Sequence, residues 1–151
     1  MAELRHILLV EDDPYDLELI MTSLASNNIV NEVVAVRDGE EALDYFYRRG
    51  KFAGRTGGNP AVVLLDLKLP KVNGFEVLRQ VKSDEALRCV PVVILTSSHE
   101  DQDIAAGYDL GANGYVVKPV DFNQFFDVIK ETGVYWAIIN ETMPESYCKP
   151  R

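Results

Sequence analysis

The sequence has few cysteines and no long hydrophobic run. Cys89 and Cys148 are its only cysteines, and they lie 148 − 89 = 59 positions apart, without the close spacing of a metal site or a redox motif. We therefore predict two reduced thiols. The first apolar run, residues 7–10, is too short for a signal peptide or a membrane span. We expect a cytoplasmic protein with no membrane partner.

Basic residues are also scarce. The 151 residues include 15 Lys and Arg against 24 Asp and Glu, for a net charge of −9. A negative surface repels the phosphates of nucleic acids, so we expect no nucleic-acid partner. With 47% hydrophobic and 26% charged residues, the composition is that of a globular domain rather than a disordered chain. The length predicts a single such domain.

Five short apolar runs predict buried strands. Continuous runs rich in β-branched residues are typical of parallel strands that are covered on both faces. The runs are residues 7–10, 33–36, 62–65, 92–95 and 115–117.

Helical patterns fill the gaps between these runs. Asp13 with Pro14 begins the first helix, Asp38 with Glu41 forms a capping-box pattern before the second, and Asp121 with Gln124 opens the last. The fourth, around residues 101–108, is weakly marked because Gly107 interrupts it. The apolar residues expected to face inward are Leu17, Ile20, Met21, Leu24, Ala42, Leu43, Phe46, Phe75, Leu78, Val81, Phe122, Phe125, Phe126 and Ile129.

The strict alternation of strands and helices predicts an α/β fold. We expect a doubly wound, five-stranded parallel sheet of order 2-1-3-4-5, flavodoxin-like, in three α/β/α layers. Ligand sites of such sheets lie beyond the carboxyl ends of the strands, where the strand order reverses. Here that point falls between the first and third strands.

Three acids follow the first strand, Glu11, Asp12 and Asp13, and Asp66 follows the third. Carboxylates about 4 Å apart repel by about 4 kcal/mol at an effective dielectric constant near 20, so a cluster of them favours a bound cation. Mg²⁺ prefers such oxygen ligands. The alternative for residues 11–13 is a solvated turn in which Asp13 caps the helix.

Thr96 follows the fourth strand and Lys118 the fifth. A carboxylate nucleophile at Asp66, a metal ion and a lysine are the parts of aspartyl-phosphate chemistry, and the Thr96 hydroxyl would donate to the same group. Taken singly, Lys118 also fits a surface lysine and Thr96 a hydrogen bond at a strand end.

Four ordered motifs carry a resemblance to a known family. They are Val10-Glu-Asp-Asp-Pro14, Leu65-Asp-Leu-Lys-Leu-Pro70 with Gly74, Leu95-Thr-Ser97 and Gly111-Ala-Asn-Gly-Tyr-Val-Val-Lys-Pro119. Over residues 5–132 the chain closely resembles the receiver domains of two-component response regulators.

The resemblance implies that Asp66 accepts a phosphoryl group from a histidine of a sensor kinase. It implies that Mg²⁺ is held directly by Asp12, through water by Glu11, by an oxygen of Asp66 and by the backbone carbonyl of Lys68. Thr96 would bond a phosphoryl oxygen, and Lys118 would pair with it.

Three further roles come from the same resemblance. Tyr115 resembles the aromatic switch residue that turns inward as Thr96 moves, although a half-buried strand tyrosine would look the same. The peptide bond before Pro119 is typically cis in the family. Gly74 resembles a turn glycine, which suits a positive φ.

Two other classes fit parts of the pattern. A phosphohydrolase that uses an aspartyl phosphate and resembles the haloacid dehalogenases would carry an acid two residues after Asp66, where Lys68 stands. A flavin-binding module would need a loop rich in glycine and hydroxyls after the first strand, where the acids Glu11, Asp12 and Asp13 stand.

Two segments depart from the common receiver pattern. Residues 49–60 form a long Gly-rich connection, which we interpret as a flexible surface loop. Residues 133–151 form a C-terminal extension, too short for an output domain, with Tyr135, Trp136, Ile138 and Ile139 near its start. Either Gly133 turns this segment back onto its own core, or it joins two receivers as a dimerisation arm; we favour a homodimer.

The loop and the aromatic arm together resemble the phytochrome-associated single-domain response regulators. This resemblance implies a red-light photoreceptor histidine kinase as the phosphodonor and a dimer built on the C-terminal region.

Overall fold

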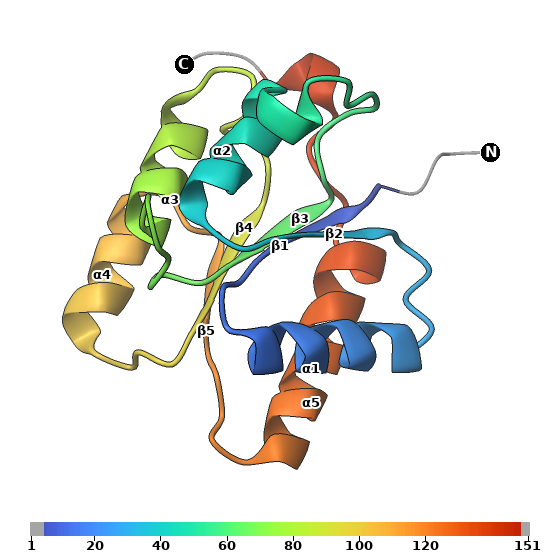
Figure 1. Ribbon diagram of the computed structural model, residues 1–151, viewed down its shortest axis with the longest axis vertical. Helices are drawn as coiled ribbons and strands as arrows, with labels where there is room; N and C mark the ends of the chain where they lie inside the picture. The colour runs from blue at the N-terminus through green and yellow to red at the C-terminus, as the bar shows by residue number, and fades with distance from the viewer. Residues whose placement is uncertain (1–4, 149–151) are drawn as a thin grey trace.

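Five parallel strands form the centre of the structure (Figure 1). The computed structural model describes residues 5–148. Its strands are β1 (Ile7–Val10), β2 (Val33–Val36), β3 (Val62–Leu65), β4 (Val92–Thr96) and β5 (Gly114–Val117). They lie in the order β2-β1-β3-β4-β5, and every neighbouring pair is parallel. The predicted sheet and its order are confirmed.

Helices cover both faces of the sheet. Figure 1 shows α1 (Pro14–Ser26) and α5 (Phe122–Gly133) on one side, with α2 (Gly39–Tyr47), α3 (Gly74–Ser83) and α4 (Asp101–Asp109) on the other. Successive β1 residues therefore enter different cores, Leu8 toward α2 and α3 and Leu9 toward α1 and α5. Within residues 5–148, no helix has the length and apolarity to cross a membrane.

Side-chain caps begin the helices where the sequence predicts them. Asp13 accepts hydrogen bonds from the first turn of α1, and Asp121 accepts one from the backbone N–H of Gln124. Asp38 accepts from the N–H of Glu41, but the Glu41 carboxylate accepts from Arg37, one residue before the cap. The reciprocal bond of this capping box is thus displaced by one residue.

The helix faces differ from the prediction at three points. α4 runs unbroken through Gly107, which is buried and lets the helix pack closely on β4, since a Cβ there would lie 2.6 Å from Cδ1 of Ile94. Phe122 is 64% exposed, since the first turn of α5 projects past the sheet (Figure 1). Met21 lies at the rim of the buried face of α1 and is 37% exposed.

The long connection after α2 is tied to the domain. It contains a short 3-10 helix, η1 (Gly50–Phe52). The Arg48 side chain donates to the Arg55 carbonyl, and Arg55 in turn donates to the Tyr45 carbonyl. The Arg55 guanidinium also lies 4.1 Å from the centre of the Tyr45 ring. The segment is therefore a loop fastened to α2 by arginines, not a free excursion.

Gly133 does not turn the chain. It keeps helical angles of −62° and −46°, and the helix continues into a π-helical turn, η2 (Val134–Ile139). A Cβ on Gly133 would lie 2.6 Å from side-chain atoms of Leu24 and Ile29, so this glycine permits close packing against the end of α1 and the segment after it. The helical turn ends at Asn140, where the backbone becomes extended, and the chain then reaches η3 (Glu145–Tyr147).

Cys89 and Cys148 form a disulfide with a Cα–Cα distance of 5.9 Å, so the prediction of reduced thiols is wrong. The spacing of the two cysteines could not reveal the bond, because it depends on the path of the chain after Asn140. That path brings Cys148 beside the turn that follows α3.

Candidate functional site

Three carboxylates meet at the C-terminal ends of β1 and β3. Glu11, Asp12 and Asp66 each place one oxygen within 4.8 Å of the others. Glu11 and Asp66 are buried, whereas Asp12 is exposed. Backbone bonds hold the buried pair in place, because Glu11 N–H donates to the Val36 carbonyl at 3.0 Å and Asp66 N–H to the Val10 carbonyl at 3.1 Å.

The ammonium group of Lys118 lies among these acids. Nζ donates to Glu11, to Asp16 Oδ2 at 2.9 Å and to Asp66 Oδ2 at 3.1 Å. Only 7% of the Lys118 side chain is exposed. Burial acts against its charge, but hydrogen bonds to Glu11 and Asp16 outweigh this and raise the pKa of Lys118. The lysine therefore stays a cation at the centre of the site.

Asp16 is a site residue that the sequence reasoning missed. The motifs drew attention to acids at strand ends, whereas Asp16 lies in the first turn of α1. A usable signal was its place three residues after the Asp13 cap, which keeps it at the same edge of the sheet.

The donor set suits a hard divalent cation. Burial raises the pKa of Glu11 to about 7, despite the hydrogen bond from Lys118. Close carboxylates repel one another, and a divalent ion with oxygen ligands offsets that repulsion. Glu11, Asp12 and Asp66 are the residues that would hold Mg²⁺. Lys68, next along the loop, donates its N–H to Asp66 Oδ1 at 3.4 Å, and its carbonyl stays a predicted ligand.

Thr96 and Tyr115 are linked through Ser98. Thr96 is fully buried at the end of β4, and its carbonyl accepts from the Lys118 N–H at 2.7 Å. Its Oγ1 accepts from the Ser98 N–H at 3.4 Å, and the Tyr115 hydroxyl donates to the Ser98 carbonyl at 2.9 Å. Burial raises the pKa of Tyr115. Ser98, which the sequence did not single out, connects the two predicted switch residues.

Gly74 is required for a different reason from the one predicted. It is the first residue of α3, and a Cβ there would lie 2.2 Å from the carbonyl oxygen of Asp66. The nearby residue with a positive φ is Lys71, at 66°. Gly74 therefore allows α3 to approach the backbone of Asp66, and its predicted positive φ is wrong.

The bond before Pro119 is trans, because residues 5–148 contain no cis peptide. The expected cis bond is therefore wrong for this structure. Trans is favoured by about 0.5–1 kcal/mol even before proline.

The residues predicted for the dimer lie apart from this cluster, on η2. Tyr135, Ile138 and Ile139 are 48%, 56% and 61% exposed. Trp136 instead packs against the core between the sheet, α1 and α5.

The comparisons with known proteins agree with this geometry. The family model described as the response regulator receiver domain matches residues 7–130. Response regulator Rcp1 of Synechocystis is 35% identical over 130 residues, covering 86% of this chain and 87% of its own. A solved structure of the Mn²⁺-bound form of Rcp1 has a TM-score of 0.86 at 33% identity, covering 93% of this chain and 99% of that one.

Two further solved structures are phytochrome-related. The phosphorylated cyanobacterial phytochrome response regulator RcpA has a TM-score of 0.87 at 39% identity, covering 94% of this chain and 100% of its own. The bacteriophytochrome response regulator AtBRR is 60% identical with a TM-score of 0.75, covering 93% and 100%. The chain therefore belongs to the response regulator receiver domain family of two-component signalling, with phytochrome response regulators among its homologues.

Proposed function

We propose that this receiver accepts a phosphoryl group on Asp66 from a phosphohistidine of a sensor kinase. The observation that carries the proposal is the meeting of Glu11, Asp12, Asp66 and Lys118 at one edge of the sheet. A buried carboxylate next to a fixed cation and two further acids is the arrangement that aspartyl-phosphate formation needs.

In the transfer, a carboxylate oxygen of Asp66 attacks phosphorus while the bond from phosphorus to the donor nitrogen breaks. The ammonium of Lys118 neutralises charge on the phosphoryl oxygens, and it is already held within 3.1 Å of Asp66. The Thr96 hydroxyl donates to one of these oxygens. A bound Mg²⁺, held by Glu11, Asp12, Asp66 and the Lys68 carbonyl, would supply further positive charge at the transferred group.

Labelling with a small acyl phosphate and Mg²⁺ tests the assignment. Intact mass should show one phosphoryl adduct on the wild type and on Asp101→Asn, an exposed acid of α4, but none on Asp66→Asn. Equal labelling of Asp66→Asn would refute the assignment. A turnover assay with generic phosphoesters separates a receiver from a phosphohydrolase, because a phosphohydrolase hydrolyses such esters continuously whereas a receiver does not.

We further propose a phytochrome-type histidine kinase as the donor and the cytoplasm as the location. The support is that RcpA and AtBRR are phytochrome response regulators by name. A phytochrome kinase autophosphorylated with labelled ATP should transfer its label to the wild type and not to Asp66→Asn. Retention of all label on the kinase would contradict this donor.

The switch proposal follows from the contact through Ser98. When Thr96 Oγ1 turns to a phosphoryl oxygen, its contact with Ser98 N–H at 3.4 Å is lost, and Tyr115 is bonded to the same Ser98. Phosphorylation therefore shifts the balance between two placements of Tyr115. In this proposal the receiver acts as a switch, and its only catalytic activities are its own phosphorylation and the slow hydrolysis of its own phosphoryl group.

We also propose that residues 133–151 extend the receiver, residues 5–132, and join two copies of it. The support is the exposed apolar face formed by Tyr135, Ile138 and Ile139 on η2. Trp136, on the inner side of the same turn, packs against the core. In sedimentation experiments, Ile138→Ser with Ile139→Ser should lower the dimer fraction, whereas Tyr108→Ser on exposed α4 should not. A monomer mass independent of wild-type concentration would contradict the dimer.

A further inference from the structure

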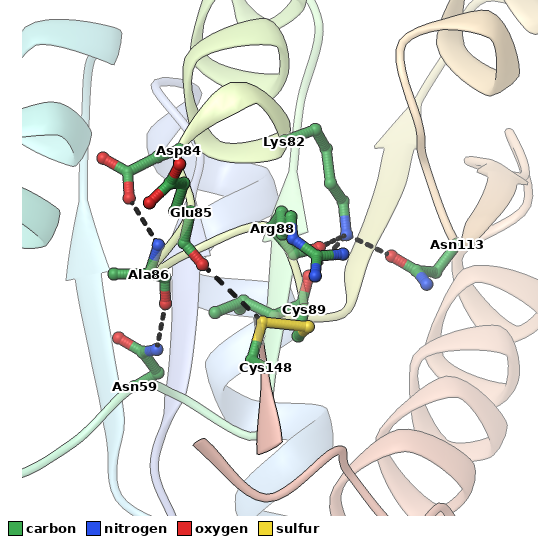
Figure 2. Close-up of a disulfide and its surroundings, with 10 residues drawn as sticks. Asn59, Lys82, Asp84, Glu85, Ala86, Arg88, Cys89, Asn113 and Cys148 are labelled. Atoms are coloured by element: carbon green, nitrogen blue, oxygen red, sulfur yellow. Dashed lines mark hydrogen bonds between the residues drawn. A yellow bond between two sulfur atoms is a disulfide. The ribbon is translucent and has the colours of Figure 1, made fainter. Parts of the chain in front are cut away.

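The Cys89–Cys148 disulfide (Figure 2) joins the turn before β4 to the last described residue of the chain. Cys89 stands three residues before β4 begins at Val92, whereas Asp66 directly follows the last residue of β3. The two positions are thus at opposite ends of neighbouring parallel strands. None of the residues assigned above to metal or phosphoryl binding lies at the disulfide end.

The turn that carries Cys89 keeps its shape through its own contacts. The Lys82 ammonium donates to the carbonyls of Arg88, at 3.1 Å, and Val90, at 2.7 Å, on either side of Cys89. Figure 2 shows Lys82 reaching across this turn to Asn113 as well. Val90 is 4% exposed and anchors the turn in the core. Cys89 is therefore held in place whether or not it is bonded to Cys148.

The segment that carries Cys148, residues 140–148, which we name the tail, has no such anchor. None of its side chains is buried. Its larger apolar side chains point to water, with Met143 51% and Tyr147 71% exposed. Burial of apolar surface therefore contributes little to holding the tail against the domain.

The other attachments of the tail are polar. The Arg5 side chain donates to Thr142 in a partly buried hydrogen bond and forms an exposed ion pair with Glu145 at 3.4 Å, and Glu145 also accepts from the Asn59 N–H at the surface. Exposed contacts such as those of Glu145 are individually weak. Apart from the main chain itself, the disulfide is the one covalent attachment of the tail among residues 5–148.

A reagent in solution can reach the sulfur of Cys148. This residue is partly exposed and lines an open groove of about 380 Å³, beside Asn59, Ala86 and Glu145. Figure 2 shows the disulfide between the Cys89 turn and the end of the tail. Thiol–disulfide exchange requires such an approach to one of the two sulfur atoms.

We propose that Cys89 and Cys148 form a second modification site, a reversible thiol–disulfide exchange site. Its oxidised form tethers the tail to the Cys89 turn, and its reduced form releases the tail. The oxidant is a small-molecule disulfide and the reductant a small dithiol. This inference does not depend on the proposed phosphorylation of Asp66.

The exchange balances as a transfer of two electrons. A thiolate of the dithiol attacks Cys148 Sγ, the bond between the protein sulfurs breaks, and Cys89 Sγ leaves with the electron pair and takes up a proton. The second thiolate of the reductant then displaces Cys148 Sγ, which is also protonated, and the reductant leaves as a disulfide. Oxidation runs these steps in reverse with a small-molecule disulfide.

Hydrogen exchange on the native protein tests the proposal. With dithiothreitol and no denaturant, iodoacetamide added to one aliquot should alkylate both cysteines, and in an unalkylated aliquot the amides of residues 141–148 should exchange faster by roughly tenfold or more, as fraying segments do. Amides of β1 and β4 should stay protected, which shows that the domain remains folded. After the dithiothreitol is removed from the unalkylated aliquot, oxidised glutathione should restore the bond and the protection of the tail amides.

Cys148→Ser gives the matched control, because it removes the tether without any redox reagent. The amide hydrogens of the tail in this variant should exchange rapidly under both oxidising and reducing conditions. The proposal is overturned if the bond resists dithiothreitol until the chain unfolds, or if the tail stays protected in the reduced wild type or in Cys148→Ser. It is also overturned if non-reducing electrophoresis shows the bond joining two chains.

Discussion

At the scale of single residues, two glycines are demanded by contact rather than by conformation. Gly74 brings α3 against the backbone of Asp66, and Gly133 brings α5 against Leu24 and Ile29. A glycine in a motif indicates that a side chain at that position is not tolerated. The reason can be a positive φ or a close contact with a neighbouring segment, and only the fold shows which of the two applies. That is why the motif revealed the importance of Gly74 and gave the wrong cause for it.

Gly74→Ala should damage both stability and the site. Its Cβ would lie 2.2 Å from the Asp66 carbonyl oxygen, and backbone cannot move aside as a flexible side chain can. Overpacking of this kind costs about 1–3 kcal/mol, and the shift of Asp66 should slow its labelling by an acyl phosphate. Urea unfolding and intact mass measure the two effects. Gly54→Ala, with nothing within 4 Å of its Cβ, is the control and should be near neutral in both.

Lys82 should make stability rise with pH. Burial lowers the pKa of Lys82 from 10.5 to about 8, so between these values the folded chain has lost a proton that the unfolded chain keeps. The unfolded state then binds more protons, and the free energy of unfolding increases across this pH range. Urea unfolding at several pH values between these limits measures the slope. An unchanged slope in Lys82→Met would contradict the assignment.

At the scale of elements, the sequence predicted the strands well and the C-terminal region poorly. The five apolar runs mark the strands to within one residue. The three inner strands are buried as predicted, whereas the edge strands β2 and β5 are mostly half-buried. The apolar residues of η2 follow no such pattern, because Trp136 faces its own core and Ile139 faces water on the same short turn. The local sequence pattern cannot show which of these side chains faces the core and which faces water.

The residues of the candidate site likewise fall into those that the sequence could predict and those that it could not. Asp66, Thr96 and Lys118 could be predicted because each directly follows a strand, or lies at its end, and parallel strands deliver their ends to one edge. Asp16 was missed although its place after the Asp13 cap was a signal, and Ser98 had no such signal. The contacts of both residues, with Lys118, Thr96 and Tyr115, depend on how a helix turn and a loop lie beside that edge.

The side chain of Asp121, which caps α5, should contribute measurably to the free energy of unfolding. Its side chain accepts from the backbone N–H of Gln124, which would otherwise lack a partner in the first turn. Asp121→Ala should lower the free energy of unfolding by about 0.5–2 kcal/mol. Thermal and urea unfolding measure the loss. Asn123→Ala, an exposed change in the same turn, should leave stability nearly unchanged, and an equal loss in both variants would rule out the cap as the cause.

At the scale of the whole molecule, the disulfide closes a loop over the second half of the chain. The 59-residue separation between Cys89 and Cys148 spans the chain from β4 to α5, a stretch that includes Thr96, Tyr115 and Lys118. A link across this length restricts the unfolded chain far more than it changes the folded one. It therefore adds stability to the domain even though the tail itself is weakly packed.

Reduction should thus destabilise the receiver without unfolding it. In the chain-entropy description a loop of this length is worth about 4 kcal/mol, and measured disulfides usually give about 2–4 kcal/mol. Urea unfolding with and without dithiothreitol should show a lower midpoint for the reduced wild type. The double variant Cys89→Ser with Cys148→Ser should have the same urea midpoint as the reduced wild type, and dithiothreitol should not change it. If dithiothreitol lowers the midpoint of the double variant equally, the stabilisation does not come from this bond.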